Sequence, residues 1–239
     1  MKKLTVLRVM TMAMAFLMVC SALAVAAEPA DQPAPRTDQG WLDRQASFNE
    51  RVKQGNVDMI FIGDSITHGW EGAGKTTWDK FYAKRNAVNL GIGGDRTQHV
   101  LYRLDNGNIN GISPKLAVIM IGTNNASEYT PEQISGGIKA IVEKLRAKLP
   151  EMKILLLAVF PREEKPGELR AKNTEVNKQI VKFDDGKNVF FLDIGNKLAQ
   201  PDGSLSKEIM PDFLHLSEKG YDIWANSIEP NVKQLLGEK

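Results

Sequence analysis

Cysteine is nearly absent from this chain, since Cys20 is the only one among 239 residues. It lies in an N-terminal segment that we expect to be removed, so the mature chain would contain none. No internal disulfide could then form, even in an oxidising compartment, and no thiol could serve as a nucleophile. This absence excludes both a disulfide-stabilised fold and thiol-based catalysis.

An excess of charge of one sign is also missing. The chain has 31 Lys and Arg against 29 Asp and Glu, a formal net charge of +2. Removal of residues 1–27 takes away three basic residues and no acidic one, which changes the net charge to −1. No basic stripe then remains for nucleic acid or an anionic membrane surface. We therefore expect neither as a partner.

The patterns of metal sites and dinucleotide sites are missing as well. No grouping of the His and acidic residues has the spacing of metal ligands. The glycine-rich stretch from Gly91 to Gly94 is a candidate dinucleotide loop, but the G-x-G-x-x-G fingerprint fails because position 96 is Arg. The sequence therefore predicts no metal and no cofactor.

The first 27 residues have the pattern of a secretory signal peptide. Three basic residues precede an apolar stretch over 9–27 that ends in small residues suited to cleavage. An uncleaved anchor helix is the alternative, because the apolar run approaches the length that spans a bilayer. A lipoprotein signal at Cys20 fits less well, since the preceding Val19 is bulky. We expect a periplasmic or secreted protein without membrane insertion after cleavage.

Residues 28–39 are rich in proline and predict a linker, disordered as far as Arg36. The rest, residues 40–239, alternates apolar runs with helix-forming segments. Predicted strands span 59–63, 87–90, 116–121, 154–160 and 189–194, and predicted helices span 41–54, 76–84, 95–104, 131–149, 168–183 and 217–236. This alternation predicts one three-layer α/β/α domain with a five-stranded parallel sheet. Right-handed crossovers favour the flavodoxin-like strand order 2-1-3-4-5.

Polar turns follow the first three predicted strands. Gly63, Asp64 and Ser65 form a tight turn that leaves a hydroxyl at the carboxyl end of the first strand, where open α/β sheets bind ligands. The next two turns contribute Gly94 and Asn124 at the same edge of the sheet. An ordinary strand exit is the alternative reading, since Gly, Asp and Ser are common in turns.

These residue types suit acyl transfer. A nucleophilic Ser65 needs a base, which is most often a His. His215 has a carboxylate three residues before it, Asp212, that can hold its tautomer and stabilise the imidazolium. The N–H groups of Ser65 and Gly94 and the carboxamide of Asn124 are suited to stabilise a tetrahedral oxyanion.

Other residues compete for these roles. His68 and His99 are the remaining histidines; the first is close to Ser65 in sequence, and the second falls within a predicted helix. Asp193 follows the fifth strand and rivals Asp212 as the orienting carboxylate. Asn124 is also a residue type that stabilises turns. The residues by themselves leave these choices open.

Four motifs resemble, in order, those of the SGNH (GDSL-type) hydrolases: G-D-S-I at Gly63, G-I-G-G-D at Gly91, G-T-N-N at Gly122 and D-F-L-H-L at Asp212. Residues 89–104 are also similar to the catalytic subunits of intracellular platelet-activating-factor acetylhydrolase.

The resemblance implies a catalytic triad of Ser65, Asp212 and His215. It also implies an oxyanion hole formed by Ser65, Gly94 and Asn124, and it favours Asp212 over Asp193.

We therefore expect an exported serine esterase that removes short acyl groups, acetyl above all, through an acyl-enzyme intermediate. O-acetylated carbohydrates or other small esters met outside the cytoplasm are the expected substrates, a choice that rests on the expected location and on the wider superfamily. Residues 67–77 and the signal peptide depart from the acetylhydrolase branch, so its own substrate is not carried over. A lysophospholipase or lipase of the same fold is one alternative, and a non-catalytic binding module is the other. Trp70 and Trp78, near Ser65 in sequence, either close the acyl pocket or pack in the core.

Overall fold

The computed structural model describes residues 29–238, so the predicted signal peptide lies outside the described residues. One parallel sheet contains β1 (Met59–Gly63), β2 (Ala87–Gly91), β3 (Leu116–Met120), β4 (Lys153–Leu157) and β5 (Val189–Leu192). The strand order is β2-β1-β3-β4-β5, and every neighbouring pair is parallel. The structure thus confirms the predicted fold class and strand order.

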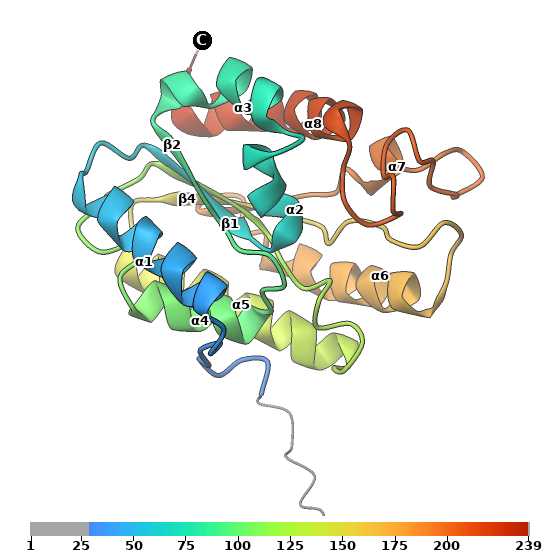
Figure 1. Ribbon diagram of the computed structural model, residues 1–239, viewed down its shortest axis with the longest axis horizontal. Helices are drawn as coiled ribbons and strands as arrows, with labels where there is room; N and C mark the ends of the chain where they lie inside the picture. The colour runs from blue at the N-terminus through green and yellow to red at the C-terminus, as the bar shows by residue number, and fades with distance from the viewer. Residues whose placement is uncertain (1–28, 239) are drawn as a thin grey trace, which may run out of the picture.

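Helices cover both faces of this sheet (Figure 1). One face carries α1 (Gln39–Lys53), α4 (Thr97–Asp105), α5 (Pro131–Lys148) and α6 (Glu168–Ile180), and the other carries α3 (Lys75–Phe81) and α8 (Glu218–Leu236). Two short helices, α2 (Ser65–His68) and α7 (Gly195–Leu198), follow β1 and β5, and the sequence did not predict them as helices. Short 3-10 helices span Gly69–Glu71, Ala83–Arg85 and Val181–Phe183.

The side chains of β1 explain why a continuous apolar run was needed there. Ile60 and Ile62 belong to the core beneath α1, α4 and α5, whereas Met59 and Phe61 belong to the core beneath α8. Successive side chains of a strand point to opposite faces, so a strand covered on both sides must be apolar at every position. All five residues of β1 are buried.

Local signals account for the ends of the longest helices. Thr130 and Gln133 form a reciprocal capping box at the start of α5, and Pro131 occupies its first turn. Ser217 caps α8 by accepting a hydrogen bond from the N–H of Gly220. Pro230 lies inside α8, and the helix continues through it.

The first described residues correct the prediction of a disordered linker. Residues 29–38 form a strap, called here the N-terminal strap, that packs beside the start of α4 (Figure 1). Ala30 and Ala34 are buried, and the Ala30 carbonyl accepts a hydrogen bond from Thr97 Oγ1 at 2.7 Å. The Ala34 N–H donates to the Gln98 carbonyl at 3.1 Å. Proline prevents this segment from forming a helix, but the small alanines between the prolines still fit against the domain.

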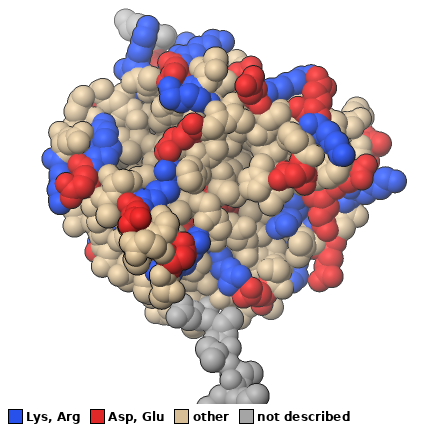
Figure 2. Space-filling model, in the orientation of Figure 1, with Lys and Arg blue, Asp and Glu red and all other residues tan. Residues whose placement is uncertain are grey.

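Charged side chains of both signs are interspersed on the face that Figure 2 shows. This distribution agrees with the near-zero net charge of the sequence. None of the helices within residues 29–238 is long and apolar enough to cross a bilayer.

Candidate active site

The turn after β1 places Ser65 at the first position of α2, with Asp64 as its N-cap. Asp64 Oδ1 accepts a hydrogen bond from the Ile66 N–H at 3.0 Å, which fixes the turn. Ser65 Oγ lies 2.8 Å from His215 Nε2, and His215 Nδ1 lies 2.7 Å from Asp212 Oδ2. Three side chains from opposite ends of the chain thus form one continuous hydrogen-bonded series.

A tight turn positions His215 for these contacts. Asp212 Oδ1 accepts hydrogen bonds from the backbone N–H groups of Leu214 and His215, at 3.0 and 2.7 Å. Phe213 within the turn has a φ of 59°, in the left-handed region that non-glycine residues rarely adopt. Its carbonyl accepts a hydrogen bond from the Glu163 N–H at 2.9 Å. Asp212 therefore both shapes the turn and orients the imidazole.

The ionisation of Asp212 determines which nitrogen of His215 carries the proton. Partial burial raises the pKa of Asp212, but hydrogen bonds from His215 and Leu214 outweigh burial, and the pKa lies below its ordinary value. An ionised carboxylate can only accept, so Nδ1 of His215 must donate to it. In the neutral imidazole Nε2 is then free to accept the hydroxyl proton of Ser65.

The competing residues have other partners. His99 Nδ1 accepts the N–H of Arg96 at the start of α4, and burial lowers the pKa of His99 to about 4. His68 Nε2 lies 3.9 Å from a carboxylate oxygen of Glu71. Asp193 is exposed and accepts the N–H of Gly195 at 2.7 Å. The structure therefore places Asp212, rather than Asp193, against His215.

Gly94 and Asn124 lie in loops that are tied to each other. Gly94 has a φ of +78°, which favours glycine. Asn124 Nδ2 donates to the carbonyl of Asp95 at 2.9 Å, and a carboxamide nitrogen carries two hydrogens, so one more can be donated. A Cβ built on the neighbouring Gly93 would lie 3.9 Å from Ser65 Cβ. The loop after β2 therefore approaches the serine closely.

The sequence did not predict how this loop is held. The carboxylate of Asp95 is fully buried and accepts hydrogen bonds from Trp41 Nε1 at 2.7 Å and Arg103 Nε at 2.9 Å. Arg36 of the N-terminal strap donates to the carbonyl of Gly93 at 2.6 Å. The signal for this network in the sequence is Asp95 itself, the last residue of the G-I-G-G-D motif.

Trp70 and Trp78 pack in the core, so the idea that they close an acyl pocket is wrong. The Trp70 ring is fully buried, with its centroid 4.6 Å from that of Tyr221 and 4.8 Å from that of Trp224. The Trp78 ring centroid lies 5.1 Å from that of Phe61, on the same face of the sheet. The chain after α2 turns towards α8, so side chains that are near Ser65 in sequence point into the core beneath α8.

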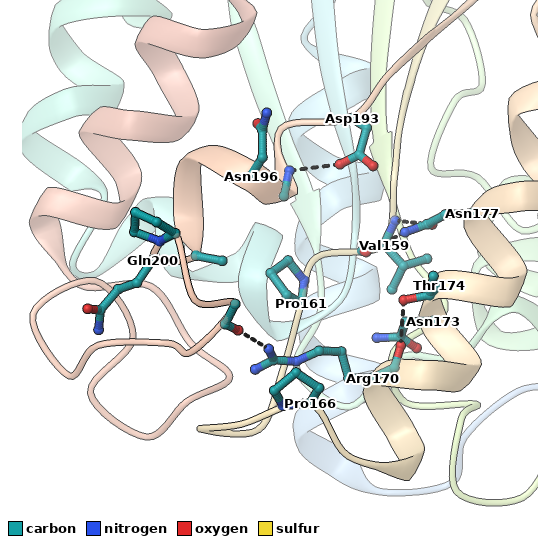
Figure 3. A pocket seen from close by; sticks show the side chains of 14 residues that line it. Val159, Pro161, Pro166, Arg170, Asn173, Thr174, Asn177, Asp193, Asn196 and Gln200 are labelled. Carbon is teal, nitrogen blue, oxygen red and sulfur yellow. Dashed lines mark hydrogen bonds between the residues drawn. The ribbon is translucent and has the colours of Figure 1, made fainter.

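A cavity of about 580 Å³ lies near the ends of β4 and β5, between α6 and α7 (Figure 3). Most of its polar groups are used within the protein: Asn177 bonds both the N–H and the carbonyl of Val159, and Arg170 donates to the carbonyls of Arg162 and Gly203. Asp193, the rival of Asp212, lines this cavity, whereas the residues of the predicted triad and oxyanion hole do not. Its polar side chains hold the loop after β4 in place.

The chain is similar in sequence to known proteins. Residues 61–223 match the model of the GDSL-like lipase/acylhydrolase family. The human platelet-activating factor acetylhydrolase IB subunit alpha2 is 39% identical over 203 residues, which cover 84% of this chain and 87% of that protein. The human alpha1 subunit is 37% identical over 218 residues, covering 88% and 92%.

Two solved structures show the same fold. A GDSL-like lipase from Bacteroides thetaiotaomicron superposes with a TM-score of 0.66 at 25% identity, covering 80% of this chain and 97% of that one. A carbohydrate acetylesterase from Sinorhizobium meliloti gives a TM-score of 0.59 at 20% identity, covering 75% and 99%. At that identity, the second likeness concerns the fold alone.

Proposed function

Because this chain belongs to the GDSL-like lipase/acylhydrolase family, and so to the ester hydrolases, we propose that it is an exported serine esterase specific for short acyl groups. The observation that carries the proposal is the hydrogen-bonded series from Asp212 through His215 to Ser65. The base lies within hydrogen-bond distance of both the nucleophile and the orienting carboxylate, as acyl transfer through a serine requires.

In the first half of the proposed reaction, Ser65 Oγ attacks the ester carbonyl while His215 Nε2 takes the hydroxyl proton. Asp212 stabilises the imidazolium that forms. The carbonyl oxygen becomes an oxyanion, which the N–H groups of Ser65 and Gly94 and the carboxamide of Asn124 stabilise. The C–O bond to the alcohol then breaks, and the alcohol leaves with the proton from His215.

In the second half, water replaces the alcohol. His215 takes a proton from this water as its oxygen attacks the acyl-enzyme, and the same donors hold the second oxyanion. Collapse of this intermediate releases the carboxylic acid and returns the proton to Ser65. The cycle needs no group beyond the side chains and backbone N–H groups already named.

The proposed acyl group is acetyl, and the proposed substrates are O-acetylated carbohydrates or other small esters. Relatives named as acetylhydrolases support the acyl part of this proposal. The predicted signal peptide supports substrates outside the cytoplasm. Because Trp70 and Trp78 belong to the core, acetyl preference draws no support from them.

A lipid ester is the second candidate within the same chemistry. The names of the two human relatives refer to platelet-activating factor, and the family description includes lipases. The difference concerns the leaving group, so Ser65, Asp212 and His215 keep the same roles. Acetylated sugars and a short-chain phospholipid assayed side by side would separate the two substrate classes.

The experiment that tests the mechanism is Ser65→Ala, with Ser47→Ala as a matched control on the exposed surface of α1. Removal of a triad nucleophile should lower kcat by several orders of magnitude, on the order of 10⁶ in a serine protease. Ser47→Ala should leave kcat unchanged, and a fluorophosphonate should label the wild type but not Ser65→Ala. Full turnover by a folded Ser65→Ala protein would refute the serine mechanism and revive a non-catalytic role for this site.

A further inference from the structure

We propose that Arg36, on the N-terminal strap, is a positioning residue that orients the Gly93–Gly94 peptide and thereby completes the oxyanion hole. The inference rests on the proposed function, because the N–H of Gly94 matters for rate only if it binds an oxyanion. It assigns a role in catalysis to a segment that its composition marks as a linker.

The guanidinium of Arg36 contacts this peptide directly. Its Nη1 donates to the Gly93 carbonyl over 2.6 Å, a short distance for a bond from a charged donor. A Cβ built on Gly94 would lie 3.0 Å from Nη1 and 3.7 Å from Cζ of Arg36. The guanidinium therefore lies against the backbone of Gly94, where no other residue type would fit without displacing it.

Because the peptide is planar, the contact of Arg36 with the Gly93 carbonyl also controls the direction of the Gly94 N–H. The carbonyl of Gly93 and the N–H of Gly94 belong to one planar trans peptide, so they point in opposite directions. When Arg36 holds the carbonyl, it also fixes the direction of the N–H, which points away from the guanidinium. The positive charge also polarises the peptide and strengthens the N–H as a donor.

The peptide between Gly93 and Gly94 needs such a contact to hold its orientation, because both residues are glycines. Neither Gly93 nor Gly94 has a Cβ, so the peptide between them can rotate at low energetic cost. An oxyanion donor accelerates the reaction only when it is oriented before the charge develops. Without Arg36, the Gly94 N–H would sample several directions, and part of its contribution to the rate would be lost.

Arg36 is itself held in place. Its Nε donates to Asp38 Oδ2 at 2.8 Å, and Asp38 caps α1 through Oδ1. Its Nη1 lies 3.8 Å from Asp95 Oδ1, and the strap before it is anchored by the buried Ala34. These two carboxylates compensate the charge of Arg36, which favours a positioning role over recognition of an anionic substrate.

The test compares Arg36→Ala and Arg36→Lys with Arg51→Ala in the full chain, using p-nitrophenyl acetate. Arg51 is the matched control because its guanidinium also donates to a backbone carbonyl, that of Gly55, at the end of α1. Loss of an oxyanion donor costs about 10²–10³-fold in kcat, and misorientation should cost part of that, so we expect about 10- to 100-fold for Arg36→Ala. KM should change less than about twofold, since the interaction forms in the transition state.

Two further measurements separate positioning from general structural support. Guanidinium at low concentration should restore part of the kcat of Arg36→Ala, while NaCl at the same ionic strength should not. Arg36→Lys, which retains the charge but lacks the planar fork, should have intermediate kcat. Arg51→Ala should keep wild-type kcat even if its melting temperature falls.

The outcomes also distinguish this inference from the proposed function. Unchanged kcat in Arg36→Ala, with Ser65→Ala inactive, would overturn the role of Arg36 and leave the serine mechanism intact. A rise in KM alone would likewise overturn it and make Arg36 a substrate-binding residue. Should Arg36→Ala fail to fold, the kcat of Arg36→Lys decides: a wild-type value overturns the role, and a reduced value at unchanged KM supports it.

Discussion

The buried carboxyl of Asp64 gives a prediction about stability that is independent of catalysis. Asp64 is fully buried beside Ser65; Oδ1 accepts the Ile66 N–H, and Oδ2 has no hydrogen-bond partner among the described residues. Burial is the main cause that raises the pKa of Asp64 from 3.8 to about 7. The folded protein therefore keeps this carboxyl protonated at pH values where the unfolded chain has lost the proton.

The direction in which pH changes the stability follows from how tightly the folded and the unfolded chain bind this proton. Because the folded-state pKa is raised, the contribution of Asp64 to stability is fully present below about pH 4 and is lost as the pH rises through about 7. At 1.36 kcal/mol per pKa unit, the whole loss is about 4 kcal/mol, of which about 3 kcal/mol falls between pH 5 and pH 8. His99, whose pKa is lowered to about 4, acts in the opposite direction over part of this range.

The comparison that isolates Asp64 is Asp64→Asn against the wild type. The amide keeps the acceptor for the Ile66 N–H but does not ionise, whereas His99 is common to both proteins. Urea unfolding at pH 5 and pH 8 should show the variant gaining about 3 kcal/mol relative to the wild type over that interval.

Asp58→Asn is the control for this comparison. Hydrogen bonds from Asn86 and Lys115 lower the pKa of Asp58, so its contribution to stability is lost only below pH 4. The stability difference between Asp58→Asn and the wild type should therefore stay constant from pH 5 to pH 8. Parallel stability curves for Asp64→Asn and the wild type would refute the reasoning about the buried carboxyl.

Three more predictions concern the site, the substrate and the N-terminus. Asn124→Ala should lower kcat by about 10²–10³-fold with little change in KM, as expected for a lost oxyanion donor. Steady-state kinetics measure both constants, and a change confined to KM would make Asn124 a ground-state binding residue. The kcat/KM for p-nitrophenyl esters should fall from acetyl through butyryl to octanoyl. Each lengthening of the acyl chain that overpacks a short pocket costs ~1–3 kcal/mol, which lowers the rate by roughly ten- to a hundredfold. A kcat/KM that rises with chain length would favour a lipase. Intact-mass analysis of protein from its native host should give a chain that begins at Ala27 or Glu28, and a mass that includes residues 1–26 would contradict cleavage.

The strands and the main helices could be predicted from the sequence because their signals are local. The run Met59–Ile62 is apolar at every position, which is typical of a strand that is covered on both faces. Thr130, Pro131 and Gln133 lie together at the start of α5, so a short window contains the whole signal. Element boundaries shifted by a few residues, as at β4, which begins at Lys153 and ends at Leu157.

The candidate site was predictable for a related reason. In a parallel sheet every strand ends at one edge, so the turns that contain Ser65, Gly94 and Asn124 had to lie near each other. The choice between Asp212 and Asp193 was different, because both follow plausible elements and both lie far from Ser65 in sequence. The four motifs favoured Asp212, and the 2.7 Å contact with His215 now places it at the imidazole.

The layers, the strand order and the edge at which the polar turns meet could thus be inferred from the order of the residues, since periodicity and crossover handedness are local properties. The direction in which each side chain beyond a turn points could not, because it depends on packing between distant elements. Trp70 lies five residues from Ser65 yet faces α8, and Arg36 lies 57 residues from Gly93 yet donates to its carbonyl. Such contacts depend on how separate elements pack, and no short window of the chain contains that information.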